Sequence, residues 1–232
     1  MQKLKEIRFL YGKPALIATI MRERYLVFGD LHIGIELELS KKGIYLFGAT
    51  EIMLEKIKAI MDEYTLKHMI ILGDIKNSIM RPTREEAFLV KNFFDGLTGK
   101  GYDIKIVLGN HDAYLDDLID LPMYKEIIIG NFAFLHGHAK PSKNVLSSKF
   151  IIAAHNHATA LIRKNSTEEE KIWAIARSRD HILVVAPAFN ELIMGTPVGN
   201  DRGRSAMNTM LRNFNMKNVE LYTLYGKKLK EA

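Results

Sequence analysis

Residues 69–77 read MIILGDIKN, and residues 104–112 read IKIVLGNHD. Each stretch is a short aliphatic run that ends in glycine followed by polar side chains, the pattern expected of a strand buried on both faces. The same construction recurs in three further stretches: YLVFGDLH (25–32), FAFLHGH (132–138) and FIIAAHNH (150–157). Open α/β sheets present ligands at the carboxyl ends of their strands, so these polar ends are candidate functional groups.

The sequence between these strands predicts helices in the first half of the chain. Apolar residues between 53 and 64 recur at spacings of three and four, with charged residues opposite, which predicts one amphipathic helix. Thr83 is expected to cap a second helix over residues 84–97. Together with strands at 15–20, 25–28, 69–72 and 104–108, this order is typical of βαβ units.

The second half has few helices and closely spaced strands, which predicts hairpins and an antiparallel arrangement. A late helix over 201–217, with Ala206, Met207, Met210, Leu211 and Phe214 on its apolar face, is expected to close the sandwich. Residues 164–170 are expected at a hairpin tip. The strands are predicted at 127–129, 132–135, 150–154, 160–163, 171–176, 181–185 and 219–224.

These expectations combine into an α/β fold class: a four-layer α-β-β-α sandwich of two packed mixed sheets with flanking helices. A chain of 232 residues with 47% hydrophobic content suits a single domain over residues 1–232. The chain has no cysteine, so disulfides, thiolate metal sites and thiol nucleophiles are excluded. Charged residues interrupt positions 1–20, and no apolar stretch approaches the ~18 residues of a membrane span, so we expect a cytoplasmic protein without a membrane segment.

The chain is basic, with a formal net charge of +6 and an isoelectric point near 9.3. A positive field raises the local concentration of phosphate-bearing molecules, which favours a polyanionic partner such as DNA, RNA or a nucleotide. A lysine-rich solvated surface, as in thermophile proteins, explains the same composition equally well. The sequence leaves open whether the chain forms homo-oligomers.

Carboxylates and imidazoles follow the apolar runs in pairs. Two residues apart in an extended segment, Asp30 and His32 project to the same side, and His155 and His157 repeat this spacing. Asp74 carries two oxygens and can therefore bridge two cations. Each motif taken alone is more often a turn than a ligand pair.

The remaining polar ends offer different chemistry. Asn110 supplies a neutral carbonyl oxygen, and His111 is a candidate general acid whose tautomer Asp112 would hold. His136 ends its strand, whereas His138 is expected to point the other way and to touch substrate at most. His68 and His181, at strand starts, are interpreted as ordinary histidines.

Five such clusters in this order resemble the calcineurin-like metallophosphoesterases. The segments 43–46 and 187–192, with Gly195, resemble the SbcD-related, ICC-like archaeal phosphoesterases. The resemblance implies two divalent metal ions bridged by Asp74 and a water or hydroxide. One ion would be held by Asp30, His32, Asp74 and His157, and the other by Asp74, Asn110, His136 and His155.

The resemblance also implies manganese as the usual activator, although nitrogen and oxygen ligands suit iron, zinc, cobalt or nickel as well. The last family motif usually reads Gly-His-x-His-Pro, whereas Ala154 and Ala158 stand here in place of the glycine and the proline. The ligands are kept, but the loop is expected to be shaped or hydrated differently. Since imidazoles bind metals in their neutral form, activity and metal occupancy are expected to fall together in mild acid.

The function expected from this resemblance is two-metal hydrolysis of phosphodiester bonds in nucleic acid or nucleotides. The alternatives are a small-molecule phosphatase, a cyclic-nucleotide phosphodiesterase, and a protein-interaction scaffold on the same fold. A complete set of seven ligand positions, together with His111, argues against the scaffold.

Overall fold

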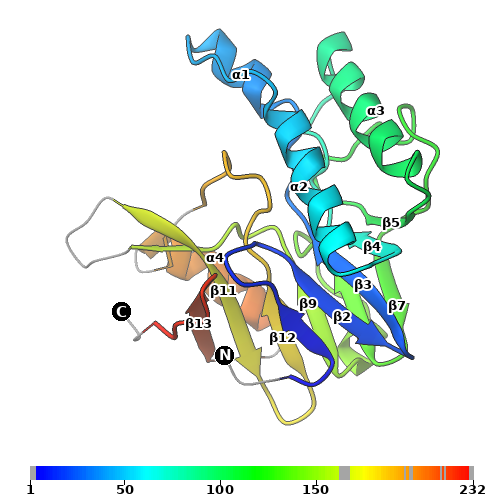
Figure 1. The fold of residues 1–232 in the computed structure, drawn as a ribbon. Coiled ribbons are helices and arrows are strands. Elements are labelled where there is room, and N and C mark those ends of the chain that lie inside the picture. The colour runs from blue at the N-terminus through cyan, green and yellow to red at the C-terminus, as the bar shows by residue number, and fades with distance from the viewer. Residues whose placement is uncertain are drawn as a thin grey trace.

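The computed structural model describes residues 4–161, 168–195, 197–198, 201–214, 216 and 218–229, without the side chains of 201, 202, 204 and 208. Two mixed sheets pack face to face, with α2 and α3 on one side and α4 on the other (Figure 1). This architecture confirms the predicted α-β-β-α sandwich.

The first sheet has the strand order β1-β2-β3-β4-β5-β6. Its first three strands form antiparallel pairs, and β3, β4, β5 and β6 run parallel, as the βαβ pattern predicts. The parallel part therefore brings the ends of β3, β4 and β5 to one edge. The strands are β1 (Ile7–Phe9), β2 (Leu16–Ile20), β3 (Glu23–Phe28), β4 (His68–Ile71), β5 (Asp103–Val107) and β6 (Met123–Tyr124).

The second sheet has the order β10-β11-β12-β9-β8-β7, and β13 also pairs with β11. The predicted antiparallel arrangement is wrong for two pairs, because β8 and β12 both lie parallel to β9. The chain crosses back between 136 and 149, so β8 and β9 end at the same edge. The strands are β7 (Glu126–Ile129), β8 (Phe132–Leu135), β9 (Phe150–Ala153), β10 (Thr159–Leu161), β11 (Glu169–Arg177), β12 (Ile182–Val185) and β13 (Val219–Thr223).

Helices α2 (Ala49–Glu63) and α3 (Arg84–Thr98) confirm the two predicted in the first half. The short helix α1 (Ile35–Lys41) and the 3₁₀ turn η1 (Val145–Ser147) were not predicted. In α1 the sequence IELELSK alternates apolar and polar residues. This period of two is typical of a strand, so it does not indicate a helix of fewer than two turns. None of the described helices is long and apolar enough to cross a membrane.

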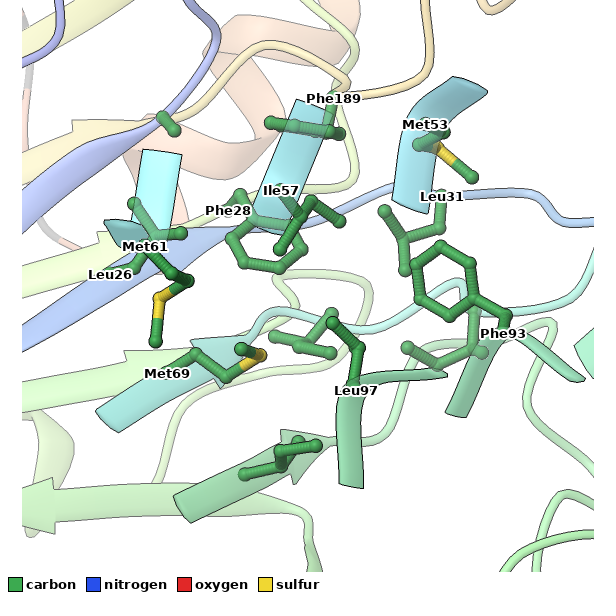
Figure 2. Close-up of a cluster of buried hydrophobic side chains, with 14 of the residues drawn as sticks. Leu26, Phe28, Leu31, Met53, Ile57, Met61, Met69, Phe93, Leu97 and Phe189 are labelled. Carbon is green, nitrogen blue, oxygen red and sulfur yellow. The ribbon is translucent and has the colours of Figure 1, made fainter. Parts of the chain in front are cut away.

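Strand alternation places the core in three layers. In β9, Phe150 and Ile152 face the first sheet, whereas Ile151 and Ala153 face outward toward α4. All four are buried, since each face of the sheet is covered. Figure 2 shows the outer cluster of the first sheet, where Phe28 and Leu31 pack with residues of α2 and α3 and with Phe189.

Helix α4 (Asp201–Asn213) covers the outer face of the second sheet, as predicted. Met207, Met210, Leu211 and Phe214 are buried there, but Ala206 is exposed, so its placement on the apolar face was wrong. The predicted end of this helix at 215 and 217, most of the hairpin tip 164–170, and the end of the strand 160–163 lie outside the described residues.

The hydroxyl of Thr83 accepts a hydrogen bond from the Glu86 N–H at 3.2 Å, which satisfies a free donor at the start of α3. We expect Thr83→Ala to lower the free energy of unfolding by about 1 kcal/mol. Urea denaturation measures this change. Thr83→Ser keeps the oxygen and should cost much less, so equal losses in both variants would contradict a capping role.

Candidate metal centre

The predicted site residues gather where the two sheets end side by side. Asp30 and Asp74 follow β3 and β4, while His136 and His155 follow β8 and β9. Backbone hydrogen bonds join these ends, from Asp30 N–H to the Gly73 carbonyl at 2.9 Å and from Ala154 N–H to the His136 carbonyl at 2.9 Å. Parallel strands in both sheets therefore assemble the cluster.

The backbone of these segments is not extended. Asp30, His32, Asp74, His155 and His157 have φ angles of 57°, 42°, 52°, 72° and 44°. Left-handed backbone costs a residue with a Cβ roughly 1 kcal/mol, and such strain is concentrated at functional sites. The prediction that Asp-x-His and His-x-His are extended pairs was wrong, since sharp turns at the strand ends aim these side chains.

Two glycines allow the strand ends to come this close. A Cβ on Gly73, whose φ is 80°, would lie 2.6 Å from the Gly109 nitrogen and 2.8 Å from His136 Nδ1. A Cβ on Gly109 would collide with the backbone and carboxylate of Asp74. Only glycine fits at these two positions without moving Asp74 or His136.

The first donor group consists of Asp30, His32, Asp74 and His157, whose ligand atoms all lie within 4.8 Å of one another. His32 Nε2 is 3.3 Å from His157 Nε2 and 3.6 Å from Asp74 Oδ2. His157 Nε2 is 3.4 Å from Asp30 Oδ1. The two carboxylates and His32 are buried, and His157 is half-buried.

The second donor group consists of Asp74, His136 and His155. His136 Nε2 is 3.3 Å from Asp74 Oδ2 and 3.1 Å from His155 Nδ1. Asn110 Oδ1 joins this group at 3.2 Å from His136 Nε2. The structure thus brings together all seven predicted ligand positions, and Asp74 belongs to both groups.

The donor atoms fit divalent cations. Ligands bound at about 2.0–2.2 Å from one ion lie roughly 3.0–3.5 Å apart, close to the spacings found here. His136 Nδ1 donates to the Leu72 carbonyl at 2.7 Å, so Nε2 is the ring nitrogen that can bind a metal. This is the usual arrangement of a ligating histidine. Buried His32 Nδ1 has no hydrogen-bond partner within the described chain.

The electrostatics of the cluster lower the pKa of some of its imidazoles and raise the pKa of another. Burial, with the neighbouring His157, lowers the pKa of His32 to about 4, and burial with His136 does the same to His155. Burial opposes the charge of Asp74, but hydrogen bonding with His136 outweighs it and holds the pKa of this carboxyl well below its usual range. The same contact raises the pKa of His136 against the effect of burial. The lowered pKa values favour the neutral form of His32 and His155, which is the form that binds a metal.

His111 lies beside the cluster but is oriented differently from the prediction. Its Nδ1 donates to the Asn77 carbonyl at 2.5 Å, and its Nε2 is 4.0 Å from Asp74 Oδ2. Because a carbonyl only accepts, Nδ1 carries a proton and Nε2 is the atom that faces the site. Asn77, not Asp112, therefore orients His111.

The Asp112 carboxylate binds backbone N–H groups, contrary to its predicted role of holding the tautomer of His111. Its buried carboxylate accepts hydrogen bonds from the N–H groups of Asp74 at 2.9 Å, Ile75 at 2.7 Å and Gly109 at 2.7 Å. Burial raises the pKa of Asp112, and the N–H donors oppose that rise. Asp112 therefore ties the loop after β4 to the loop after β5.

Asp112→Asn turns an amide NH₂ toward these N–H donors, so at least one loses its acceptor. We expect the free energy of unfolding to fall by about 1–3 kcal/mol. Urea denaturation of metal-free protein measures the loss. The exposed Asp116, in the same segment, provides the control Asp116→Asn, which should change stability little. If Asp112→Asn left the free energy of unfolding unchanged, the proposed binding of backbone N–H groups by Asp112 would be contradicted.

His138 lies next to the cluster, so the prediction that it points away was wrong. Its ring centroid is 5.3 Å from that of His136 and 6.1 Å from that of His155. Gly137 has a φ of 112°, which breaks the extended geometry on which the prediction rested. The histidine therefore borders the approach to the second donor group.

Ala154 and Ala158, which replace the usual glycine and proline, are both buried. The Ala154 carbonyl accepts the Asn156 N–H at 2.9 Å, and the Ala158 carbonyl accepts the Ile172 N–H at 3.0 Å. The Asn156 side chain also reaches Met210 Sδ at 3.4 Å. The last loop is thus tied to β11 and α4, and keeps His155 and His157 at the cluster.

Two lysines around the site, one buried and one half-buried, were not predicted. Lys76, two residues after Asp74, is fully buried and donates to the carbonyls of Ser78 and Met80. Lys171, in β11, donates to the carbonyls of Ala188 at 2.8 Å and Asn190. Lys76 is followed by Asn77 and Lys171 is preceded by Glu170, so neither lies inside an apolar run and no local signal identifies them.

Lys171 holds a loop that supports the first motif. Phe189 N–H donates to the Gly29 carbonyl at 2.9 Å, and the Asn190 amide donates to the Leu31 carbonyl at 2.7 Å. Phe189 also packs on Phe28, with ring centroids 4.9 Å apart (Figure 2). The turn that carries Asp30 and His32 is therefore braced from the second sheet.

Comparison with the solved structure of a nuclease supports the fold. Nuclease MPE from Pseudomonas putida superposes with a TM-score of 0.64 and 19% sequence identity, over 93% of this chain and 92% of that chain. Phosphoesterase Yfce from E. coli gives a TM-score of 0.42 and 14% identity, over 69% of this chain and 77% of that one. No curated protein matches the chain at a significant level.

The family model described as calcineurin-like phosphoesterase matches residues 23–221, which include every residue of the cluster. The match agrees with the order of motifs along the chain and with the packed sheets that bring them together. The protein is therefore a member of the calcineurin-like phosphoesterase family, whose members are metal-dependent hydrolases of phosphoesters.

Proposed function

We propose that this protein hydrolyses phosphodiester bonds in nucleic acid or nucleotides with two divalent metal ions, of which manganese is our first candidate. The observation that carries the proposal is the sharing of Asp74 between two donor groups, with His111 beside them. Asp30, His32, Asp74 and His157 would hold one ion, and Asp74, Asn110, His136 and His155 the other. Two such ions supply Lewis acidity and an activated water.

His111 supplies the acid in this proposal. Water adds to phosphorus and loses one proton to solvent, the bond from phosphorus to the leaving oxygen breaks, and His111 Nε2 gives its proton to that oxygen. Asn77 keeps the ring in place through Nδ1. His111 regains its proton from solvent, and the products are a phosphomonoester and an alcohol.

Nucleic acid or nucleotides are the proposed substrates for two reasons. The net charge of +6 favours polyanions, and the similar fold of nuclease MPE belongs to a protein that cleaves nucleic acid. DNA, RNA and dinucleotides share the phosphodiester that the site would bind.

The test is hydrolysis of bis(p-nitrophenyl) phosphate, p-nitrophenyl phosphate, and single-stranded and duplex DNA by protein stripped of metal and then reloaded. We expect manganese to restore cleavage of the diester and of at least one DNA substrate. Elemental analysis should find two ions per chain. Hydrolysis of the monoester alone would overturn the diesterase assignment.

A further inference from the structure

Two separate cavities border residues of the site, one against His111 and the other against the proposed ligand His136. One has a volume of about 410 Å³ and is lined by His111 together with Leu37, Lys41, Asn77 and Ile79. The other has a volume of about 530 Å³ and is lined by His136 and His138 together with Lys125, Ala139 and Lys140. They have no lining residue in common, so His111 and His136 border two separate cavities.

Each cavity is large enough for an organic group, since small-molecule sites span about 300–1,000 Å³. A phosphodiester has two such groups, one on each side of phosphorus. A monoester fills only one side, and a cyclic nucleotide carries both ester oxygens on one sugar. Resting on the proposed function, we infer that the two cavities receive the two organic groups of a phosphodiester, each up to the size of a nucleoside.

The position of His111 assigns the two sides. Its Nε2 faces Asp74 from the wall of the smaller cavity, so the oxygen that accepts its proton leaves on that side. The leaving alcohol therefore occupies the His111 cavity. The group that stays on phosphorus occupies the cavity beside His138.

The wall of the leaving-group cavity is held in place. The Ser78 N–H and hydroxyl both bind the Glu86 carboxylate, at 2.8 and 2.5 Å, and Lys76 holds the Met80 carbonyl at 2.9 Å. The Asn77 amide binds the Glu38 carboxylate at 3.0 Å. These contacts fix the loop and leave Ile79 56% exposed as an apolar surface for the leaving group.

The retained-group cavity has a different charge. Lys125 and Lys140 line it together with one carboxylate, Glu126, which already accepts the Ser142 N–H at 2.9 Å. The cavity is therefore net positive and suits a group that carries a further phosphate. Continuation of a nucleotide chain on this side matches that charge.

The test fills one cavity at a time. Ile79 and Ala139 are both exposed, so Ile79→Trp and Ala139→Trp add bulk to a surface without entering the core. The substrates are methyl p-nitrophenyl phosphate and the p-nitrophenyl ester of thymidine 5′-monophosphate. Both are diesters with the same leaving group, and they differ only in the group retained on phosphorus.

We expect Ala139→Trp to raise KM for the thymidine ester about tenfold or more and to leave KM for the methyl ester within about twofold. Ile79→Trp should raise KM for both esters by the same factor. In calorimetry with manganese-loaded protein, thymidine 5′-monophosphate should bind Ala139→Trp about tenfold more weakly than wild type and bind Ile79→Trp as well as wild type.

Equal effects of Ala139→Trp on both esters, or none on either, would overturn the assignment of the two cavities while leaving the diesterase proposal intact. A reversed pattern, with Ile79→Trp selective for the thymidine ester, would overturn it as well. Failure of the wild-type protein to hydrolyse either ester with manganese would instead overturn the proposed function.

Discussion

Replacing Asp74 by asparagine is expected to abolish metal binding and diesterase activity together. Asp74 Oδ2 lies 3.3 Å from His136 Nε2 and 3.6 Å from His32 Nε2, so it serves both donor groups. Asparagine offers one neutral oxygen and cannot bridge two cations. We expect kcat/KM for bis(p-nitrophenyl) phosphate to fall by about 10³-fold or more, equivalent to about 4 kcal/mol at the transition state.

Elemental analysis and initial rates measure the two losses in the same sample. The control is Asp103→Asn, because Asp103 also pairs with a histidine, His68 at 2.9 Å, but at the opposite end of the parallel strands. That variant should keep its metal and its activity. Binding of two ions by Asp74→Asn, as in the wild type, would contradict the proposal that both ions share this ligand. Circular dichroism shows whether each variant is folded.

Replacing His111 by asparagine is expected to slow hydrolysis according to the leaving group. The Asn side chain carries a donor toward the Asn77 carbonyl but no proton that can be transferred from the position of Nε2. Cleavage of thymidylyl-thymidine, which expels an alkoxide, should slow by about 10²–10⁴-fold. Hydrolysis of bis(p-nitrophenyl) phosphate should slow much less, because its leaving group departs as a stable anion.

Metal content separates this effect from damage to the site. His111→Asn should retain both ions in elemental analysis, in contrast to Asp74→Asn. As a matched control, His181→Asn replaces a histidine at the start of β12 whose Nδ1 contacts the Ser148 carbonyl at 3.0 Å, and it should leave both rates unchanged. Equal slowing of the two substrates by His111→Asn would contradict the role of an acid.

Much of the fold follows from local sequence. The aliphatic runs of β3, β4, β5, β8 and β9 place strands to within one or two residues, and helical periodicity places α2 and α3. The direction of the strands in the second sheet does not follow from local sequence. A short strand reads the same in either direction, and only the crossover between 136 and 149 makes β8 and β9 parallel.

The orientation of side chains in the site was the least predictable feature. The spacing of Asp30 and His32 is compatible with an extended pair, yet both have left-handed backbone. His138 faces the cluster because Gly137 turns the chain. Asp112 neighbours His111 in sequence, but its carboxylate binds N–H groups from the loop after β4 instead. Each difference arises from contacts with residues distant in sequence.

The sequence by itself determined which residues are available for chemistry, because several clusters of carboxylates and imidazoles each follow a buried strand. It also determined the family, since the order of the five motifs is carried along the chain. Only the tertiary structure decided that Asn77 orients His111 and that His111 and His136 border two separate cavities. The physical reason is that the relative position of the two sheets is set by core packing and by crossovers, which no local pattern encodes.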